Sequence, residues 1–192
     1  NIVFRRLTGG YLLSPEWSLE PGIYLADRKA KTMEKVTEDG FNAHFAADED
    51  RLYFTDYAPD SKYTELELYS VDLKGRDERT LLKGDKVTEY QLSPDGKWIG
   101  YTHQNNAFVA PFLSTGLQQE LDIEGSGLPV AQVSKRAGEY LSWSAGSDRL
   151  SWSHGATVFS RDLNQAFSFL AGAPDELPEP VSEGLKLGFS QI

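Results

Sequence analysis

Cysteine is absent from this chain of 192 residues. The chain therefore has no disulfide bonds, no thiolate metal ligands and no cysteine nucleophile. Basic residues are in the minority, since 19 Lys and Arg stand against 29 Asp and Glu and the formal net charge is −10. Nucleic acids and anionic lipid surfaces are bound through clustered Lys and Arg. We therefore expect no nucleic-acid partner and no membrane insertion.

Long apolar runs are missing as well. No stretch approaches the roughly 18 consecutive apolar residues of a membrane-spanning helix, and residues 1–6 lack the pattern of a signal peptide. Residues 27–36 are the only run of helix-favouring residues, and they form no apolar stripe. Because the chain starts at Asn1, in what reads as the middle of a strand, we expect a piece of a longer protein.

An internal repeat is the strongest feature of the sequence. Three segments, 45–55, 92–102 and 143–153, each begin with a bulky apolar residue and carry an aromatic residue nine positions later. The residues between them are rich in Ser, Pro, Asp and Gly, which favour tight turns. Each segment therefore predicts a hairpin of two short strands. The paired positions are Phe45 and Phe54, Leu92 and Tyr101, and Trp143 and Trp152.

Two further strands are predicted in each repeat unit. A third strand follows the hairpin, and its four copies align on aromatic residues spaced 45, 39 and 51 positions apart. The third strands are predicted at 23–27, 68–72, 107–111 and 158–162. A weaker fourth strand is predicted around Val36, Leu81, Val133 and Val181.

Four-stranded antiparallel units that recur every 40 to 50 residues are typical of a β-propeller. We therefore predict an all-β chain of about four blade units, a segment of a larger propeller. An immunoglobulin-like sandwich is the alternative, but it does not predict the recurring nine-residue offset. The units are expected at 1–40, 41–86, 87–136 and 137–184, with a lone first strand of a further unit at 186–190.

The two ends of the chain are expected to complete each other. Residues 2–4 fit the second strand of a unit whose first strand is missing, and residues 186–190 offer a first strand with no unit of its own. Unpaired strand edges are templates for pairing. We predict that 186–190 pair with 2–6, of a second molecule rather than of the same one, which implies a homodimer through the terminal strands.

The residues also carry a resemblance to a known family. Ser93-Pro94-Asp95-Gly96-Lys97 is similar to the S-P-D-G-K repeat of TolB-type propellers. Residues 106–112, 140–144 and 158–163 together resemble the TolB-like region that precedes the metal-dependent amidohydrolase barrel in large exported bacterial hydrolases. The resemblance covers most of the chain, and its motif specifies fold more than function.

This resemblance implies a function for the chain. It implies a periplasmic or secreted, non-catalytic module that binds a partner domain or gates an adjoining hydrolase active site. The parent protein would then be a metal-dependent amidohydrolase whose barrel is not in this chain. The alternatives are a propeller of a prolyl-oligopeptidase-type serine peptidase and a free-standing TolB-like envelope scaffold.

Catalytic motifs are missing from the sequence. It contains no H-x-H or H-E-x-x-H metal motif and no G-x-S-x-G nucleophile elbow. The acidic clusters at 48–50 and 56–60 lack the spacing of a calcium loop, and we interpret them as solvated turns. We therefore expect no catalytic residue, no metal and no cofactor in this chain.

Four residues are candidates for a binding surface. His103 and His154 each follow a second-strand aromatic residue by two positions, and His44 directly precedes Phe45 at the predicted start of a first strand. Second-to-third and fourth-to-first connections share one face of a propeller, so all three histidines are expected near one rim. The fourth candidate is Trp17, the only tryptophan in a predicted loop. Trp98, Trp143 and Trp152 lie on predicted strands, and we expect Trp143 and Trp152 in the core.

Overall fold

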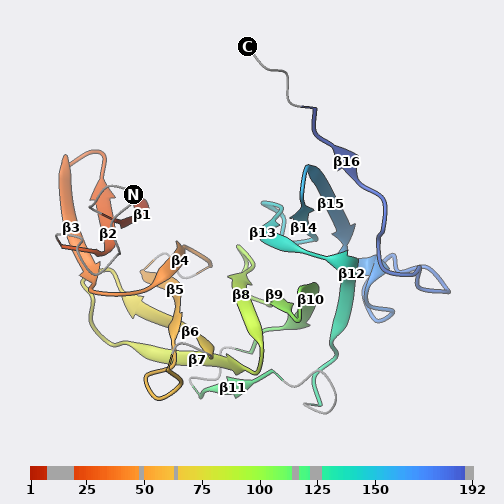
Figure 1. Ribbon diagram of the computed structural model, residues 1–192, viewed down its shortest axis with the longest axis horizontal. Helices are drawn as coiled ribbons and strands as arrows, with labels where there is room; N and C mark the ends of the chain where they lie inside the picture. The colour runs from red at the N-terminus through yellow and green to blue at the C-terminus, as the bar shows by residue number, and fades with distance from the viewer. Residues whose placement is uncertain (8–19, 48–49, 63–64, 114–116, 122–126, 189–192) are drawn as a thin grey trace. The chain divides into compact units, whose positions relative to one another are not determined.

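A computed structural model describes residues 1–7, 20–47, 50–62, 65–113, 117–121 and 127–188. The chain divides into two compact units. The first contains Asn1–Gly84 with Gly116–Glu120, and the second contains Asp85–Thr115 with Leu121–Ile192. Each unit holds two β-sheets (Figure 1). The only helix among the described residues is a 3-10 turn at Leu163–Gln165.

The first unit begins with a three-stranded antiparallel sheet of order β1-β2-β3. The strands are β1 (Ile2–Arg6), β2 (Gly22–Asp27) and β3 (Thr32–Thr37). Phe4 lies opposite Tyr24, and their rings stack at 5.9 Å. Among the described residues, β1 is an edge strand of this sheet.

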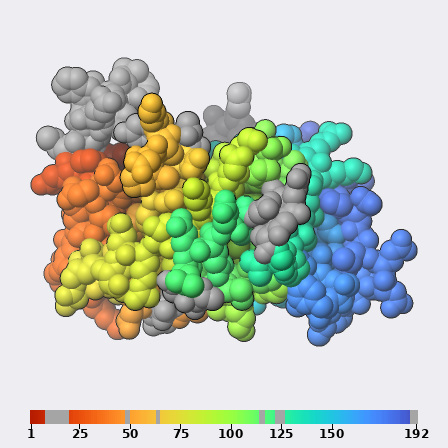
Figure 2. All heavy atoms as spheres, turned by 90° about the horizontal axis from the view of Figure 1, so that it is seen from below, coloured from red at the N-terminus to blue at the C-terminus, as the bar shows by residue number. Residues whose placement is uncertain are grey.

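The second sheet of the first unit has the order β11-β7-β6-β5-β4. The strands are β4 (Phe41–His44), β5 (Arg51–Tyr57), β6 (Leu66–Asp72), β7 (Arg79–Gly84) and β11 (Gln119–Glu120). The repeat did not predict β11, which comes from the long connection after residue 112 and pairs in parallel with β7. Figure 2 shows its residues in green beside the yellow-green residues of β7.

The second unit holds two four-stranded sheets, β12-β10-β9-β8 and β13-β14-β15-β16. The first consists of β8 (Val87–Leu92), β9 (Trp98–His103), β10 (Asn106–Pro111) and β12 (Ala131–Ala137). The second consists of β13 (Glu139–Trp143), β14 (Arg149–His154), β15 (Thr157–Asp162) and β16 (Leu185–Lys186). The main sheets are meanders in which consecutive strands pair antiparallel. This is the construction of β-propeller blades, and the all-β propeller prediction is confirmed.

The last strand differs from the sequence prediction. The fourth strand expected around Val181 is reduced to an isolated bridge with Ser134, and Leu185–Lys186 instead pair with Val158 and Thr157. The prolines at positions 174, 178 and 180 have no N–H to donate, so this stretch cannot form a ladder. Residues 185–186 are therefore the outer strand of the fourth sheet. The prediction that they start a further unit was wrong.

The core repeats with the predicted nine-residue spacing. Phe54, Tyr101 and Trp152 are all buried, and each stacks on an aromatic residue of the neighbouring strand. Trp152 is 2% exposed and packs among Leu150, Leu141, Ala107 and Val133. Trp143 is only partly buried at the edge of the same cluster. The core assignment is thus confirmed for Trp152 and corrected for Trp143.

Several hydrogen bonds link the two sheets of the second unit. The Trp143 indole N–H donates to the Gln91 carbonyl at 2.8 Å, and the Leu141 N–H donates to the Glu89 carboxylate at 2.8 Å. Two further links run from Thr102 Oγ1 to the Gly138 carbonyl at 2.9 Å and from the Asp95 N–H to Ser147 Oγ at 3.0 Å. These bonds satisfy polar groups where the blades pack, which fixes one blade against the next.

Candidate binding site in the first unit

A cavity of about 660 Å³ opens in the first unit. It lies where β1 and β5 end and β4 begins, so it is formed by second-to-third and fourth-to-first connections. These are the connections where the sequence predicted a binding surface. Its charged and aromatic lining residues are Arg5, Asp39, Phe41, Asp56, Tyr57 and Lys62.

Glycine allows β4 to enter beside the cavity. Gly40 is buried and has a φ of 103°, a conformation that residues with a side chain rarely adopt. A Cβ at this position would lie 2.6 Å from Cδ2 of Phe54. The close approach of Gly40 to the Phe54 ring therefore sets where Phe41, the first residue of β4, enters the cavity wall.

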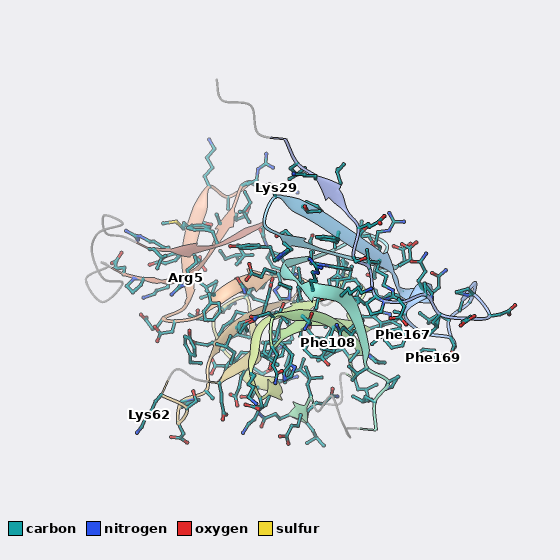
Figure 3. The ribbon with its side chains drawn as sticks, turned by 45° about the vertical axis from the view of Figure 1, so that its right-hand side comes forward. Arg5, Lys29, Lys62, Phe108, Phe167 and Phe169 are labelled. Carbon is teal, nitrogen blue, oxygen red and sulfur yellow. The ribbon has the colours of Figure 1, made fainter. Side chains whose placement is uncertain are left out.

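A turn between β5 and β6 forms another part of the lining. The Ala58 N–H donates to the Glu65 carbonyl at 2.9 Å, and the Ser61 N–H donates to the Ala58 carbonyl at 3.0 Å. The Ser61 hydroxyl donates to the same Ala58 carbonyl at 2.8 Å. These bonds hold the turn that carries Lys62, which is exposed (Figure 3).

Two aromatic rings and a cation form one side of the cavity. The Phe41 and Tyr57 ring centroids are 5.9 Å apart, with the planes tilted by 54°. The Arg5 guanidinium carbon lies 5.8 Å from the Phe41 centroid, within the range of a cation–π contact. Tyr57 is 39% exposed. The rings therefore offer apolar surface that is already held in position.

Asp56 is the half-buried carboxylate of the site. Burial raises the pKa of Asp56, and this outweighs the Tyr57 N–H, which donates to Asp56 Oδ1 at 2.8 Å, and the Arg5 charge, both of which lower it. Asp39 also raises the pKa of Asp56 through like-charge repulsion. A hydrogen-bond donor or a cation on a ligand would replace the contacts with water that burial has removed from this carboxylate.

The sequence analysis missed Asp56 as a site residue. We interpreted residues 56–60 as a solvated turn, which holds for the exposed Asp60 but not for Asp56. The repeat contains the signal that could have found it. Asp56 follows Phe54 by two positions, as His103 follows Tyr101 and His154 follows Trp152.

The predicted histidines lie at different places in their blades. His103 and His154 end β9 and β14, as expected, and the His103 ring lies edge-on to Phe108. His44 does not begin its strand, because β4 starts at Phe41 and ends at His44. Its Nδ1 lies 2.8 Å from the Asn42 carbonyl and its ring stacks on Tyr53. Burial lowers the pKa of His44.

Other predicted features can be placed only in part. Trp17 lies outside the described residues. Within the described ranges, no three or more His, Asp or Glu side chains lie close enough together to hold a metal ion. No helix in that part of the chain is long and apolar enough to span a membrane.

Comparisons with known proteins bear on the fold alone. No family model and no curated protein matches the chain. Among solved structures, it is similar to an oligogalacturonate lyase in complex with manganese, with 13% identity, a TM-score of 0.46 and coverage of 68% of this chain and 37% of that one. It is also similar to the β-propeller domain of the trilobed protease from Pyrococcus furiosus, with 10% identity, a TM-score of 0.45 and coverage of 76% and 47%.

A third similar structure is the Kuenenia stuttgartiensis hydrazine synthase, with 12% identity, a TM-score of 0.47 and coverage of 74% of this chain and 46% of that one. The chain thus spans less than half the length of each of these three proteins. Identities and TM-scores this low say nothing about activity or ligand.

Proposed function

We propose that this chain is a non-catalytic propeller module that binds a peptide segment of a partner protein or adjoining domain in the cavity of the first unit. The observation that carries the proposal is the half-buried Asp56 beside the Phe41–Tyr57 ring pair. Burial has removed part of the water around this carboxylate, and a fixed aromatic wall lies next to it. Such an arrangement suits ligand binding better than it suits packing of the core.

The lining favours a peptide over a simple ion. Arg5 and Lys62 are cationic and Asp39 and Asp56 are acidic, so the formal charges of the cavity cancel. A peptide can match such a lining, because it brings amide donors and carbonyl acceptors together with side chains of both signs. The rings of Phe41 and Tyr57 supply the apolar contact that anchors interfaces.

The proposal for the wider setting of this module is supported by the TolB-like resemblance of residues 93–97, 106–112, 140–144 and 158–163. We place the chain in an exported, periplasmic or secreted bacterial hydrolase of the amidohydrolase type, where the bound segment would gate access to the adjoining active site. The gene sequence on either side of residues 1–192 distinguishes this from the alternatives. A barrel with H-x-H supports it, G-x-S-x-G indicates a serine peptidase, and a stop codon indicates a scaffold.

The binding proposal is tested by titrating the chain with eight-residue peptides that differ only in their charges. The panel contains an acidic, a basic, a neutral and a mixed-charge peptide, each with one central leucine. We expect the mixed-charge peptide to bind most tightly and to shift the backbone amide NMR signals of residues 39–41 and 56–62. Signals that shift elsewhere, or not at all with any peptide, would contradict the proposal.

A pair of variants separates the cavity from the surface around it. Asp56→Asn is expected to weaken binding of the mixed-charge peptide by about fivefold, because the variant loses one ion pair worth ~1 kcal/mol. Asp60→Asn makes the same charge change at an exposed position of the same turn and is expected to leave the affinity unchanged. Equal effects of the two variants would mean that only net charge matters.

A further inference from the structure

A second cavity, of about 460 Å³, lies entirely within the second unit. It sits between two equivalent first-to-second-strand turns, at the opposite strand ends from those that carry His103 and His154. The turn between β8 and β9 contributes Asp95, and the turn between β13 and β14 contributes Asp148. Asp162 at the end of β15 and the segment that follows it complete the lining.

The two turns hold their carboxylates in the same way. The Ser93 hydroxyl donates to Asp95 Oδ1 at 2.6 Å, and the Ser144 hydroxyl donates to Asp148 Oδ1 at 2.6 Å. The hydrogen bond from the Asp95 N–H to Ser147 Oγ joins the turns to each other. The carboxylates are thus fixed before any ligand arrives, which reduces the entropy cost of binding.

These carboxylates are ionised at neutral pH. Burial raises the pKa of Asp95, but hydrogen bonds from Ser93 and from the Lys97 N–H outweigh burial, so its pKa is lowered overall. The hydrogen bond from Ser144 lowers the pKa of Asp148. Three carboxylates line the cavity together with the cation Arg149, whose Nε donates to Asp162 Oδ1 at 2.5 Å. The formal charge of the lining is therefore negative. Outside the lining, Lys97 Nζ lies 3.6 Å from Asp95 Oδ2.

An aromatic and aliphatic wall lies beside the carboxylates. Trp98 lines the cavity and packs on Phe167 at 5.2 Å, and Phe167 in turn packs on Phe169 at 5.3 Å. Leu163 and Leu170 add aliphatic surface to the lining. Phe169 is 60% exposed and projects from the segment after β15 (Figure 3).

This combination selects one kind of cation. Within the described residues the acidic side chains are too dispersed to hold a metal ion. A lysine or arginine side chain instead has a long apolar stem and a charged head, so its stem can lie on an apolar wall while its head meets carboxylates. The Trp98 ring can also make a cation–π contact with the charged head. Exposed Phe169 supplies further apolar surface for the chain that carries the cation.

We propose that this cavity receives a lysine or arginine side chain of a partner protein, with Asp95, Asp148 and Asp162 facing its charge and Trp98 its stem. The proposal does not depend on the cavity of the first unit. The cation that binds here belongs to a protein side chain and is not a free small amine.

The test measures binding by calorimetry and by the indole N–H signal of Trp98 in NMR. The probes are a heptapeptide with a central arginine between leucines, the same peptide with neutral citrulline in place of arginine, and agmatine as a free cation. The arginine peptide is expected to bind at least tenfold more tightly than the other two and to weaken with added salt. Equal binding of the citrulline peptide, or tighter binding of agmatine, overturns the proposal.

Variants locate the binding. Asp148→Asn is expected to weaken the arginine peptide about fivefold. Asp175→Asn, the same change at an exposed position outside the lining, is the matched control and should have no effect. Phe169→Ala should weaken the peptide but not agmatine. Because Asp148 and Phe169 are exposed, the variants should fold, which thermal unfolding checks. Equal effects of Asp148→Asn and Asp175→Asn overturn the proposal.

Discussion

At the scale of residues, the stability of the second unit depends on a few large buried rings. Trp152 is almost completely removed from water and stacks on Phe159. Trp152→Ala is expected to lower the free energy of unfolding by about 3–5 kcal/mol, through lost apolar burial and the cavity left behind. Denaturant titration measures this change, and an unfolding midpoint close to that of the unchanged chain would mean that the ring is not in the core.

Trp143 makes a different contribution, because its ring is only partly buried and its N–H bonds the Gln91 carbonyl. Trp143→Phe keeps most of the ring and removes the donor. We expect a loss of about 1 kcal/mol in the free energy of unfolding, the value of a typical hydrogen bond. A loss as large as that of Trp152→Ala would show that Trp143 is part of the core after all.

His44 should make the stability of the chain depend on pH. Burial lowers the pKa of His44 from 6.5, so the folded state binds a proton less readily than the unfolded state. Its contribution is present above pH 6.5 and is lost as the pH falls through the folded-state pKa. His44→Gln should therefore reduce the loss of stability on acidification.

Denaturant titrations from about pH 7 to pH 5 measure this effect relative to the unchanged chain. His154→Gln, the same change at an exposed histidine, is the matched control. If the two variants behave alike over this range, His44 is not the group responsible.

The sequence predicted the buried residues better than the binding residues. The nine-residue spacing located Phe54, Tyr101 and Trp152 correctly, because burial selects large apolar side chains at fixed strand positions. Asp56 was missed because its composition is that of any solvated turn. Phe41 and Arg5 line the same cavity but come from other strands, so the local sequence pattern does not reveal that they lie near Asp56.

At the scale of elements, Gly40 sets the entry of β4 into its sheet. Gly40→Ala places a methyl group in a left-handed conformation and against the Phe54 ring. Gly155 also has a positive φ, 57°, but no atom lies within 4 Å of where its Cβ would be. Both Ala variants should lose about 1 kcal/mol from backbone strain.

Only Gly40→Ala should lose a further 1–3 kcal/mol or so from overpacking, and should also weaken binding in the first cavity. Thermal unfolding of the two variants side by side measures the difference. Equal losses would mean that the contact with Phe54 does not matter.

We predict that two molecules associate through the edge strands of their sheets. Residues 185–186 pair with β15 of their own chain, so they are not the unpaired strand that the sequence suggested. Among the described residues, β1 and β16 are nevertheless edge strands of their sheets. Exposed edges favour pairing with other chains, so we still predict a homodimer through the terminal strands. Sedimentation at several concentrations measures it, and a monomer throughout would contradict it.

Elements were predictable where the repeat was regular. The hairpins follow turn residues and alternating aromatic positions, which act locally. Besides the start of β4, the errors concern β11 and β16, strands of two residues each. Such short strands form only because a neighbouring edge offers hydrogen-bonding partners, and no local sequence pattern encodes that.

At the scale of the whole molecule, the chain combines a repetitive β scaffold with cavities of different charge. The cavity of the first unit is lined by charges of both signs, whereas that of the second unit is mainly acidic. Propeller blades provide similar frames, and the residues at their connections determine what binds. The period of the repeat could therefore predict the fold, whereas the chemistry of the sites needed the positions of side chains from several strands.

The most direct test of this account is one NMR time course of the chain with the mixed-charge peptide. A binding module that does no chemistry predicts shifted amide signals at 39–41 and 56–62 and a peptide spectrum unchanged after a day. At equal, sub-saturating peptide concentration the same signals should shift less in Asp56→Asn, in line with an affinity about fivefold weaker. Cleavage of the peptide that persists through purification, or unchanged amide signals in these segments, would contradict the account.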